Sequence, residues 1–229
     1  MKKLITFSVL LIALWCVSAF PAAAFPRLDY GAKIGLNATG LLGSDVDKTS
    51  FPKKGLVGGG LVRWNMSPGI GLQVELLYSQ RGSESSVSNF SLVDTLKIKL
   101  DYLEIPVLMR YELPLPGKVK PNLLFGPALA FKVSAKTTTD DNSSFYDSEL
   151  EIMNARGTDF SIVLGAGVDI AFGKGLWQFE ARYNIGLTKV FEDVSPETGI
   201  AEDEIAFTDN GEALDLKNGG FSFTIGYVF

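Results

Sequence analysis

The chain of 229 residues contains no histidine and a single cysteine. Histidine is the side chain whose charge ordinarily changes near neutral pH, and many hydrolases use it as their general base. Without it, the candidate bases are carboxylates and lysines, and no nucleophile–base pair stands out among the serines and threonines. The sequence therefore predicts that the protein is not an enzyme, and it assigns no catalytic, cofactor-binding or metal-binding residue.

An excess of positive charge is also missing. The chain has 21 basic and 26 acidic residues, which gives a net charge of −5. Lys2 and Lys3 lie in a segment that we expect to be removed, so the mature charge falls to −7. A nucleic-acid partner is disfavoured, because such partners bind to basic surfaces.

Long hydrophobic runs are absent except at the N-terminus. There the basic pair precedes an apolar stretch at 4–17, and Ala22-Ala23-Ala24 supplies small residues for cleavage. This order is typical of a secretory signal peptide, and the run is shorter than the ~20 residues of a membrane-spanning helix. We expect residues 1–24 to be the signal peptide and the mature protein to begin at Phe25. Cys16 follows residues too bulky for a lipoprotein motif and leaves with the signal, so the mature chain can form no disulfide.

What the chain does contain is alternation, and its end shows this most clearly. Over residues 219–229, large apolar side chains occupy every second position, and small or polar residues lie between them. The large residues are Phe221, Phe223, Ile225, Tyr227 and Phe229. A period of two predicts a β-strand with one apolar face.

Seven earlier segments alternate in the same way. The sequence thus predicts eight strands, near 28–38, 56–66, 70–79, 96–112, 122–133, 159–172, 177–188 and 219–229. Inside the fourth, the apolar phase reverses, and a β-bulge near Asp101 would reconcile its two halves. Pro106 has no backbone N–H to donate and predicts a local break in the pairing.

The connections between these segments alternate in length. Three are short, and four are long and polar. The short ones lie near 67–69, 114–120 and 173–176, and the long ones near 39–54, 80–95, 134–158 and 189–217. Bacterial outer-membrane barrels have short periplasmic turns and long outer loops in this order. We therefore predict an all-β fold, an eight-stranded antiparallel up-and-down transmembrane β-barrel over residues 25–229, in the cell outer membrane.

A soluble, exported, lipocalin-like barrel that carries a small apolar ligand is the alternative, because it has the same number of strands. Its apolar face would lie inside, and alternation alone does not say which face that is. Three features favour the membrane barrel. The polar face is rich in glycine, which suits a crowded lumen, the apolar face is rich in aromatic residues, and the chain ends on Phe229 without a following helix.

Four segments also carry a family resemblance. They are Tyr102-Leu103-Glu104-Ile105-Pro106-Val107-Leu108-Met109-Arg110-Tyr111, 120–128, 159–168 and 179–183. Together they resemble strands of the PorT-like family of outer-membrane β-barrels, and the resemblance extends from about Tyr30 to Phe229. It implies an outer membrane protein β-barrel domain. The namesake of that family takes part in assembling a protein-secretion system, but no residue of this chain carries that role over.

The expected partners follow from this fold. They are outer-membrane lipid, the barrel-assembly machinery, which would recognise the C-terminal strand ending at Phe229, and an unidentified extracellular or periplasmic protein. We expect a structural or interaction role through the extracellular loops, with an accessory part in secretion or envelope assembly as one form of it. We expect a monomer, and not a channel, because side chains just fill an eight-stranded barrel.

The last long connection is strongly acidic, with nine carboxylates and no lysine or arginine between residues 191 and 216. The simple interpretation is a solvated outer loop. Divalent-cation binding by Asp209-Asn210-Gly211-Glu212 or by Glu202-Asp203-Glu204 is the alternative, although neither has the spacing of an EF-hand. The same two interpretations apply to Asp140-Asp141 and 147–151.

Charged residues at inward positions predict ion pairs in the lumen. They are Arg63, Glu75, Glu104, Arg110, Asp169, Glu180 and Arg182. The turn at 67–69 places Arg63 opposite Gln73 and diagonal to Glu75. A four-residue turn at 173–176 would set Asp169 opposite Glu180 and Gly167 opposite Arg182. The guanidinium of Arg182 would then lie between the two carboxylates.

Overall fold

A computed structural model of the chain describes residues 28–43, 50–89, 92–140, 148–152, 154–192, 204–205, 208–209, 212–213 and 216–229. The expected signal peptide, Cys16 and the cleavage site before Phe25 lie outside the described residues and stay predictions. Across the described chain, no helix has the length and hydrophobicity needed to span a bilayer.

The described chain forms strands joined by turns and loops. The strands are β1 (Leu28–Gly43), β2 (Ser50–Ser67), β3 (Ile70–Asn89), β4 (Leu92–Glu112), β5 (Val119–Asp140), β6 (Ser148–Ile152), β7 (Thr158–Phe172), β8 (Gly175–Lys189), β9 (Glu204–Ile205), β10 (Thr208–Asp209), β11 (Glu212–Ala213) and β12 (Leu216–Val228).

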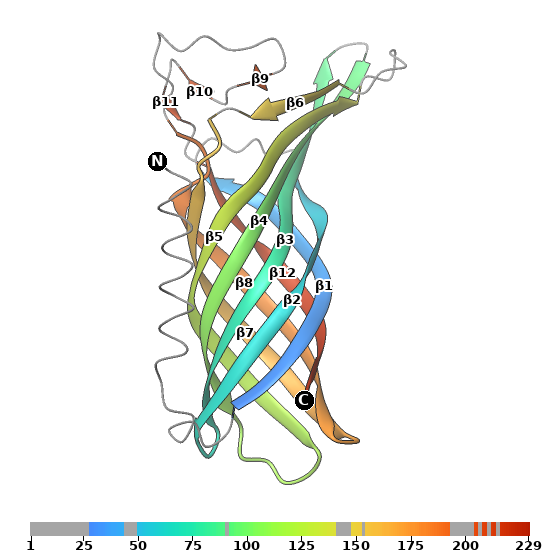
Figure 1. Cartoon of the computed structure of the whole chain (residues 1–229). Helices are drawn as coiled ribbons and strands as arrows, with labels where there is room; N and C mark the ends of the chain where they lie inside the picture. Colours follow the sequence, from blue (N-terminus) through green and yellow to red (C-terminus); the bar gives the residue numbers. More distant parts are fainter. Residues whose placement is uncertain are drawn as a thin grey trace.

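Eight of these strands close into an antiparallel barrel, in the order β1–β2–β3–β4–β5–β7–β8–β12, with β12 back against β1 (Figure 1). The closing ladder runs from Gly31 opposite Val228 to Gly43 opposite Leu216. Beyond it, the backbone N–H of Phe229 donates to the carbonyl of Tyr30 at 2.8 Å. The predicted eight-stranded up-and-down barrel is confirmed. Seven predicted strands lie entirely within observed ones, and the eighth extends beyond β12 by one residue, Phe229.

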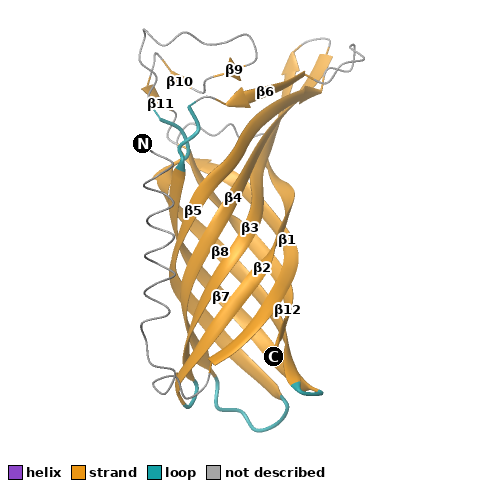
Figure 2. Ribbon diagram, in the orientation of Figure 1, coloured by secondary structure: helices purple, strands orange, loops and turns teal. Residues whose placement is uncertain are grey.

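The two ends of the barrel differ (Figure 2). One end carries the short turns, such as Gly173-Lys174 between β7 and β8. At the other end β3, β4 and β5, with 20, 21 and 22 residues, continue past the barrel, whereas β7, β8 and β12 have 15, 15 and 13. There β6 pairs with β5, and β9 pairs with β6. At about 3.3 Å per residue, the extra length of β5 over β7 projects roughly 20 Å.

The alternation of the strands sorts side chains between two faces. The outer face carries large exposed apolar residues on every barrel strand, among them Ile34, Leu76, Phe125 and Phe179. The inner face carries charged and amide side chains that are almost fully buried. The soluble, ligand-carrying alternative is therefore wrong, because its apolar face would line the interior, whereas here that face lies outside, where only lipid satisfies it.

The β-bulge lies where the sequence predicts it, since the register of β4 with β5 shifts between Asp101 and Tyr102. The extra residue is Val133 of β5, which lies between the partners of those two residues. β4 itself keeps one phase. Its apolar residues Ile98 and Leu100 consequently face inward and are buried, so the expectation that the bulge would turn them outward is wrong.

The predicted break at Pro106 is confirmed on one side of β4. The ladder with β3 passes from Val107, opposite Val74, to Glu104, opposite Leu77, and Pro106 lies in the gap. On the other side Pro106 stands opposite Ala128 of β5. The ladder is thus interrupted over two residue pairs, those of Ile105 and Pro106, without a change of register.

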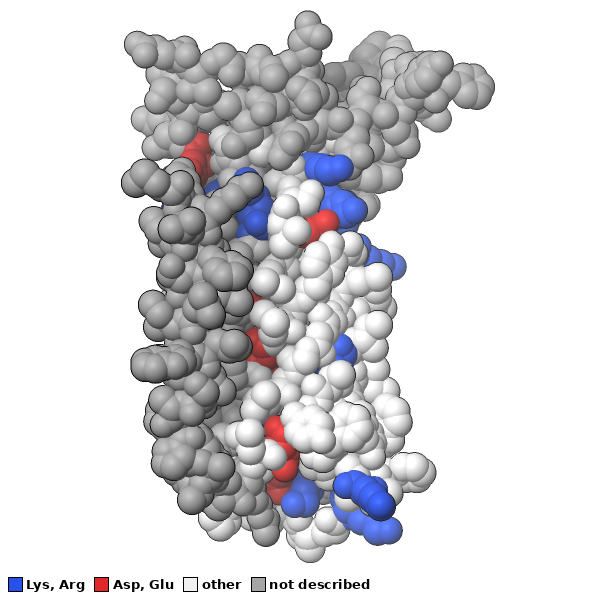
Figure 3. All heavy atoms as spheres, in the orientation of Figure 1, with Lys and Arg blue, Asp and Glu red and all other residues white. Residues whose placement is uncertain are grey.

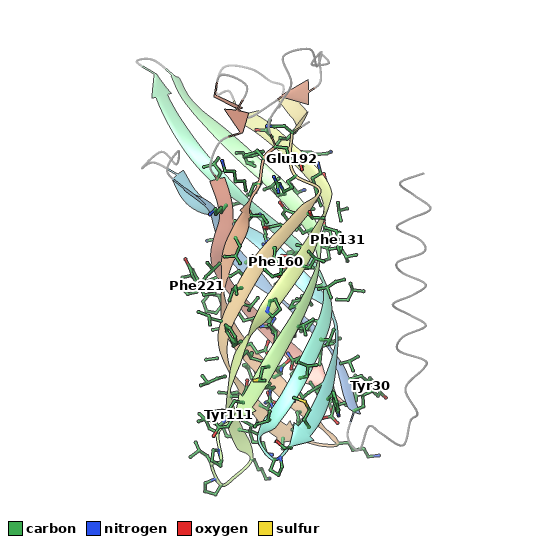
Figure 4. The ribbon with its side chains drawn as sticks, turned by 90° about the vertical axis from the view of Figure 1, so that its left-hand side faces the viewer. Tyr30, Tyr111, Phe131, Phe160, Glu192 and Phe221 are labelled. Carbon is green, nitrogen blue, oxygen red and sulfur yellow. The ribbon has the colours of Figure 1, made fainter. Side chains whose placement is uncertain are left out.

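Aromatic residues gather on the outer face toward both ends (Figure 4). Near the turns, Tyr30 stacks on Phe229 with ring centroids 5.4 Å apart, and Trp177 meets Tyr227 edge-on at 5.4 Å. Toward the loop end, Tyr183 lies against Phe221 at 4.8 Å. Amphipathic aromatic rings at two levels are typical of the two interfaces of a membrane.

Candidate functional site

The middle of the lumen is held by four charged side chains. Arg182 of β8 donates to both carboxylate oxygens of Glu75 of β3, at 2.7 and 2.6 Å, and to Glu180 at 2.6 Å. Lys33 of β1 donates to the same two carboxylates, at 2.8 and 2.6 Å. All four side chains belong to residues at most 5% exposed. Two acids and two bases compensate one another, which is the condition for burying charge without a large penalty.

Gln73 of β3, fully buried, extends this cluster toward the turn end. Its amide nitrogen donates to Glu75 at 2.6 Å and to Glu180 at 3.3 Å. Its amide oxygen accepts from Arg63 Nε at 3.2 Å and from the amide of Gln178 at 3.3 Å. The side chains are thus joined across the lumen in one hydrogen-bond network.

A second cluster lies nearer the turns, around Asp169 of β7. Its Oδ2 accepts from Arg63 at 2.8 Å and from Arg110 at 2.7 Å. Arg110 also donates to Glu112 at 3.3 Å, and Lys120 donates to Glu112 at 2.9 Å. The positive charges of the two arginines are therefore shared between a buried and a half-buried carboxylate.

A third cluster lies toward the loop end and is centred on Arg81 of β3. Arg81 pairs with Glu104 at 2.7 Å and with Asp159 at 3.4 Å, and its guanidinium lies 5.6 Å from the ring centroid of Tyr102. Asp159 also accepts from Thr188 at 2.6 Å and from Asn218 at 2.8 Å. Each carboxylate of this layer faces a cation or a polar hydrogen.

Above the third cluster, apolar residues close the outer mouth. Val190 and Phe191, which follow β8, are buried, and Ala155 forms a bridge with Phe191. They pack in one cluster with Ile98, Leu100, Tyr102, Ala130, Ala135, Ile152 and Leu216. The backbone is fixed as well, since Val190 N–H donates to Leu216 O at 2.8 Å. A layer without charge therefore covers three layers of paired charge.

The predicted ion-pair cluster in the lumen is confirmed, and all seven charged residues assigned to it are buried. The predicted partners are wrong in part. Arg182 lies between Glu75 and Glu180, and not between Asp169 and Glu180. Asp169 pairs with Arg63 and Arg110 instead. Arg63 does stand opposite Gln73, but Gly167 stands opposite Glu180, and Gly165 stands opposite Arg182. The cause is the turn after β7, which has two residues instead of four, so that Phe172 pairs with Gly175.

Two glycines of β7 leave room for the charged side chains opposite them, with Gly165 in the place predicted for Gly167. A Cβ on Gly165 would lie 3.0 Å from Arg182 Cγ, and one on Gly167 would lie 3.0 Å from Glu180 Cγ. The side chains of Arg182 and Glu180 thus lie against β7 at positions where glycine leaves space for them.

Lys33 was not among the predicted ion pairs. The sequence places it on the polar face of its strand, but both of its partners lie beyond the strands adjacent to β1. Only closure of the barrel brings β3 and β8 toward β1. Arg81 and Asp159 were missed for the same reason, because their contact joins β3 to β7 across the lumen.

The acidic segments predicted as alternative cation sites lie outside the side chains that the structure describes, and this includes Asp140-Asp141 and 147–151. Asp203, Asn210 and Gly211, among others, lie outside the described residues, and the side chains of Glu204, Asp209 and Glu212 are not described either. Among the side chains that the structure does describe, no group of three or more acidic, histidine or cysteine residues could hold a metal ion.

In a comparison with known protein families, the family model described as the outer membrane protein beta-barrel domain matches residues 21–192 of this chain. The chain belongs to this family. It is therefore an outer-membrane β-barrel protein, as its outward apolar face requires. No curated protein matches the chain at a significant level.

Solved structures with a similar fold come from several bacteria. Ail of Yersinia pestis is 13% identical over 88% of this chain and 98% of its own, with a TM-score of 0.38. Neisserial surface protein A is 14% identical over 88% and 97%, with a TM-score of 0.43. OprG of Pseudomonas aeruginosa is 12% identical over 88% and 94%, with a TM-score of 0.42.

Proposed function

We propose that the protein is a closed membrane anchor that presents its outer loops, together with the extended ends of β3, β4 and β5, to a partner protein. The observation that carries this proposal is the filled lumen. Arg182, Lys33, Glu75 and Glu180 bridge β1, β3 and β8 at hydrogen-bond distance, so the barrel interior serves to hold the wall together. The surface left for recognition is outside the membrane.

The length of the strands supports this role. A strand crosses a bilayer with about 9–11 residues, so β12, with 13, is little longer than the membrane requires. β5 has 22 residues, and its outer part pairs with β4 and β6 in a sheet that has left the barrel. The residues of this projecting sheet are not needed to span the membrane. A projecting sheet of this kind is suited to contact with another protein.

Within the family, we place the chain with the PorT-like members, on the strength of the strand Tyr102–Tyr111. From this resemblance alone, and with no residue of the chain that carries the role over, we propose an accessory role in secretion or envelope assembly. We also propose that the protein is not an enzyme. The carboxylates of Glu75, Glu180 and Asp169 are engaged by cations, and the sequence supplies no histidine. The remaining partners that we propose are membrane lipid and, during assembly, a machinery that recognises the strand ending at Phe229. We propose a monomer.

The test is to shorten the extension while leaving the barrel intact. Ser83 of β3 stands opposite Ile98 of β4, so residues 84–97 can be replaced by a two-residue Asn-Gly turn in register. A photoreactive residue at Lys136 would report contacts in living cells. We expect protein adducts with the full chain and none with the shortened one, at equal folded yield in unheated gels.

The matched control replaces Pro114 and Pro116 in the turn between β4 and β5 by serine, at the opposite end of the barrel. Adducts should persist in this control. Adducts that persist in the shortened chain, or that vanish in the control, would show that the extension is not the contact surface.

A further inference from the structure

A groove crosses the outer face of the barrel wall over β7 and β8. At its centre lie Ala166 of β7 and Ala181 of β8, which stand directly opposite each other and are both exposed. In the same row, the next residues are Leu123 of β5 and Phe223 of β12. The groove has a volume of about 940 Å³, and its outward-facing side chains are all apolar. We call it the wall groove.

The small side chains at the centre of the wall groove are not required by packing inside the barrel. On the inner face of β7, Gly165 and Gly167 leave space for the charged side chains that lie against them. Ala166 and Ala181 point the other way and are exposed, so a larger side chain at either position would extend outward into the groove. The groove is therefore a feature of the outer surface alone.

The wall groove continues toward the turn end of the barrel. A second hollow of about 370 Å³ is lined by Phe172 and Trp177, and Phe179 lines both hollows. Ala166 and Ala181 each lie about six residues from the turn that joins β7 to β8. A rise of about 3.3 Å per residue and a strand tilt of about 40° place them roughly 15 Å from the turn. The hydrocarbon core is about 30 Å thick, so both hollows lie in the half of the membrane next to the turns.

The wall groove is continuous with the lipid-facing surface of this outer-membrane protein. In the face drawn in Figure 3, charged residues gather toward the two ends of the wall, and the surface between them is mostly uncharged. The hydrocarbon core holds no water that could fill a hollow at this level, and an empty hollow would leave its lining without contacts. What fills the groove must therefore be an apolar component of the membrane.

We propose that the wall groove holds an acyl chain of one phospholipid of the inner leaflet, which enters beside Trp177 and ends over Ala166 and Ala181. The turns of a bacterial barrel face the periplasm, and the leaflet on that side of the outer membrane consists of phospholipids. An acyl chain is unbranched and flexible, so it follows a groove between two rows of side chains. The volume of the groove lies within the range of small-molecule sites, about 300–1,000 Å³. This site rests on the proposed lipid partner but not on the outer extension, so the two proposals fail separately.

The test fills the groove with side chains of the protein itself. The variant is Ala166→Leu with Ala181→Leu, and the control is Ala32→Leu, which enlarges an exposed, outward alanine of β1 outside the groove. The mature barrel is extracted from outer membranes in a mild non-ionic detergent, and native mass spectrometry counts the lipids that remain bound. We expect one phospholipid on most molecules of the wild type and of the control. The filled variant should carry it on a roughly tenfold smaller fraction of molecules, because the apolar contacts of the chain are lost.

Thermal unfolding in detergent separates loss of the site from loss of the fold. Added phospholipid should raise the unfolding temperature of the wild type and of Ala32→Leu, because a ligand that binds only the folded state stabilises it. The filled variant should unfold at the wild-type temperature without lipid, and added phospholipid should not raise that temperature. Ala181→Leu alone gives the same test with a smaller loss of bound lipid, if the double variant does not fold.

The proposal is overturned if the filled variant retains as much phospholipid as the wild type, if the control loses it equally, or if the wild type retains none. Retention of lipid A in place of phospholipid would also overturn it, because the site would then belong to the other leaflet. A filled variant that folds but is less stable than the wild type without lipid would show that packing of the protein requires the two alanines.

Discussion

The inner and outer faces of this barrel are made by neighbouring residues of the same strands, but they differ in chemistry. The outer face is apolar and exposed, and the inner face is charged and buried. On β8, Phe179 is 43% exposed and points outward, whereas the next residue, Glu180, is 4% exposed and points into the lumen. The outer face is satisfied by its surroundings and needs few contacts within the protein. The side chains of the inner face contact only one another, so each of its charges requires a partner within the lumen.

The comparison shows what closes the barrel. Backbone ladders join each barrel strand to its neighbours, but several lumenal ion pairs join strands that the ladders leave apart. Arg182 of β8 reaches Glu75 of β3, and Arg63 of β2 reaches Asp169 of β7. The wall is therefore braced across its diameter. Changes on the two faces should consequently fail in different ways, and the following predictions use that difference.

The largest effect is expected from a change in β12, because this strand closes the barrel against β1 and contributes to both faces. Removing Tyr227–Phe229 takes away the last pairings with β1 and the ring contacts of Tyr227 and Phe229 with Trp177 and Tyr30. We expect most of the folded protein to disappear from the outer membrane, as measured by the mobility difference between unheated and boiled samples. Phe229→Trp, which keeps an aromatic end, should fold normally. A normal folded yield after the truncation would contradict this role of the closing strand.

Breaking the inner face comes next. Arg182→Leu leaves Glu75 and Glu180 buried with one cation, Lys33, between them. Loss of one partner from a buried network costs about 3–5 kcal/mol, because a charge remains uncompensated. Urea unfolding of the refolded barrel in detergent at neutral pH measures the free energy of unfolding. Lys174→Leu, an exposed lysine in a turn, should change it little. Equal stability of Arg182→Leu and wild type would show that the pairing contributes nothing.

Breaking the outer face should cost somewhat less. Ile225 of β12 is exposed on the apolar face between Ile34 and Phe179 of the adjoining strands. Arginine at the middle of the lipid-facing band costs about 2–4 kcal/mol. We expect Ile225→Arg to destabilise the barrel by this amount in lipid vesicles, and Ile225→Val to be nearly neutral. A charged residue tolerated there without loss would mean that lipid does not cover this face.

The fold could be predicted almost completely from the sequence, because the alternation of apolar and polar residues within each strand defines its outer and inner faces. The period of two within each strand and the three short turns concern residues near one another in the chain. Even the bulge opposite Asp101 and the gap at Pro106 are local features. The inward direction of Ile98 and Leu100 could not be predicted, because it depends on the cap that Phe191 and Ala155 form above them.

The lumen could be predicted in composition but not in its contacts. Arg63 was placed opposite Gln73 correctly, because Pro68-Gly69 marks a tight turn. The register after β7 was wrong because turns of two and of four residues both keep the faces in phase, and alternation does not separate them. Lys33 was missed because its partners lie on β3 and β8, which no pattern within one strand can indicate.

The central claim is that paired side chains and an apolar cap close this lumen, so that the barrel acts through its outer surface. Conductance of the purified barrel in planar bilayers tests it most directly. We expect no stable open channel, because Arg182, Lys33 and Phe191 occupy the path at two levels. Arg182→Leu provides an internal check, since any leak that it opens must exceed that of the wild type. Reproducible steps of porin-like size from the wild-type protein would contradict the account, because they would mean that the lumen is open.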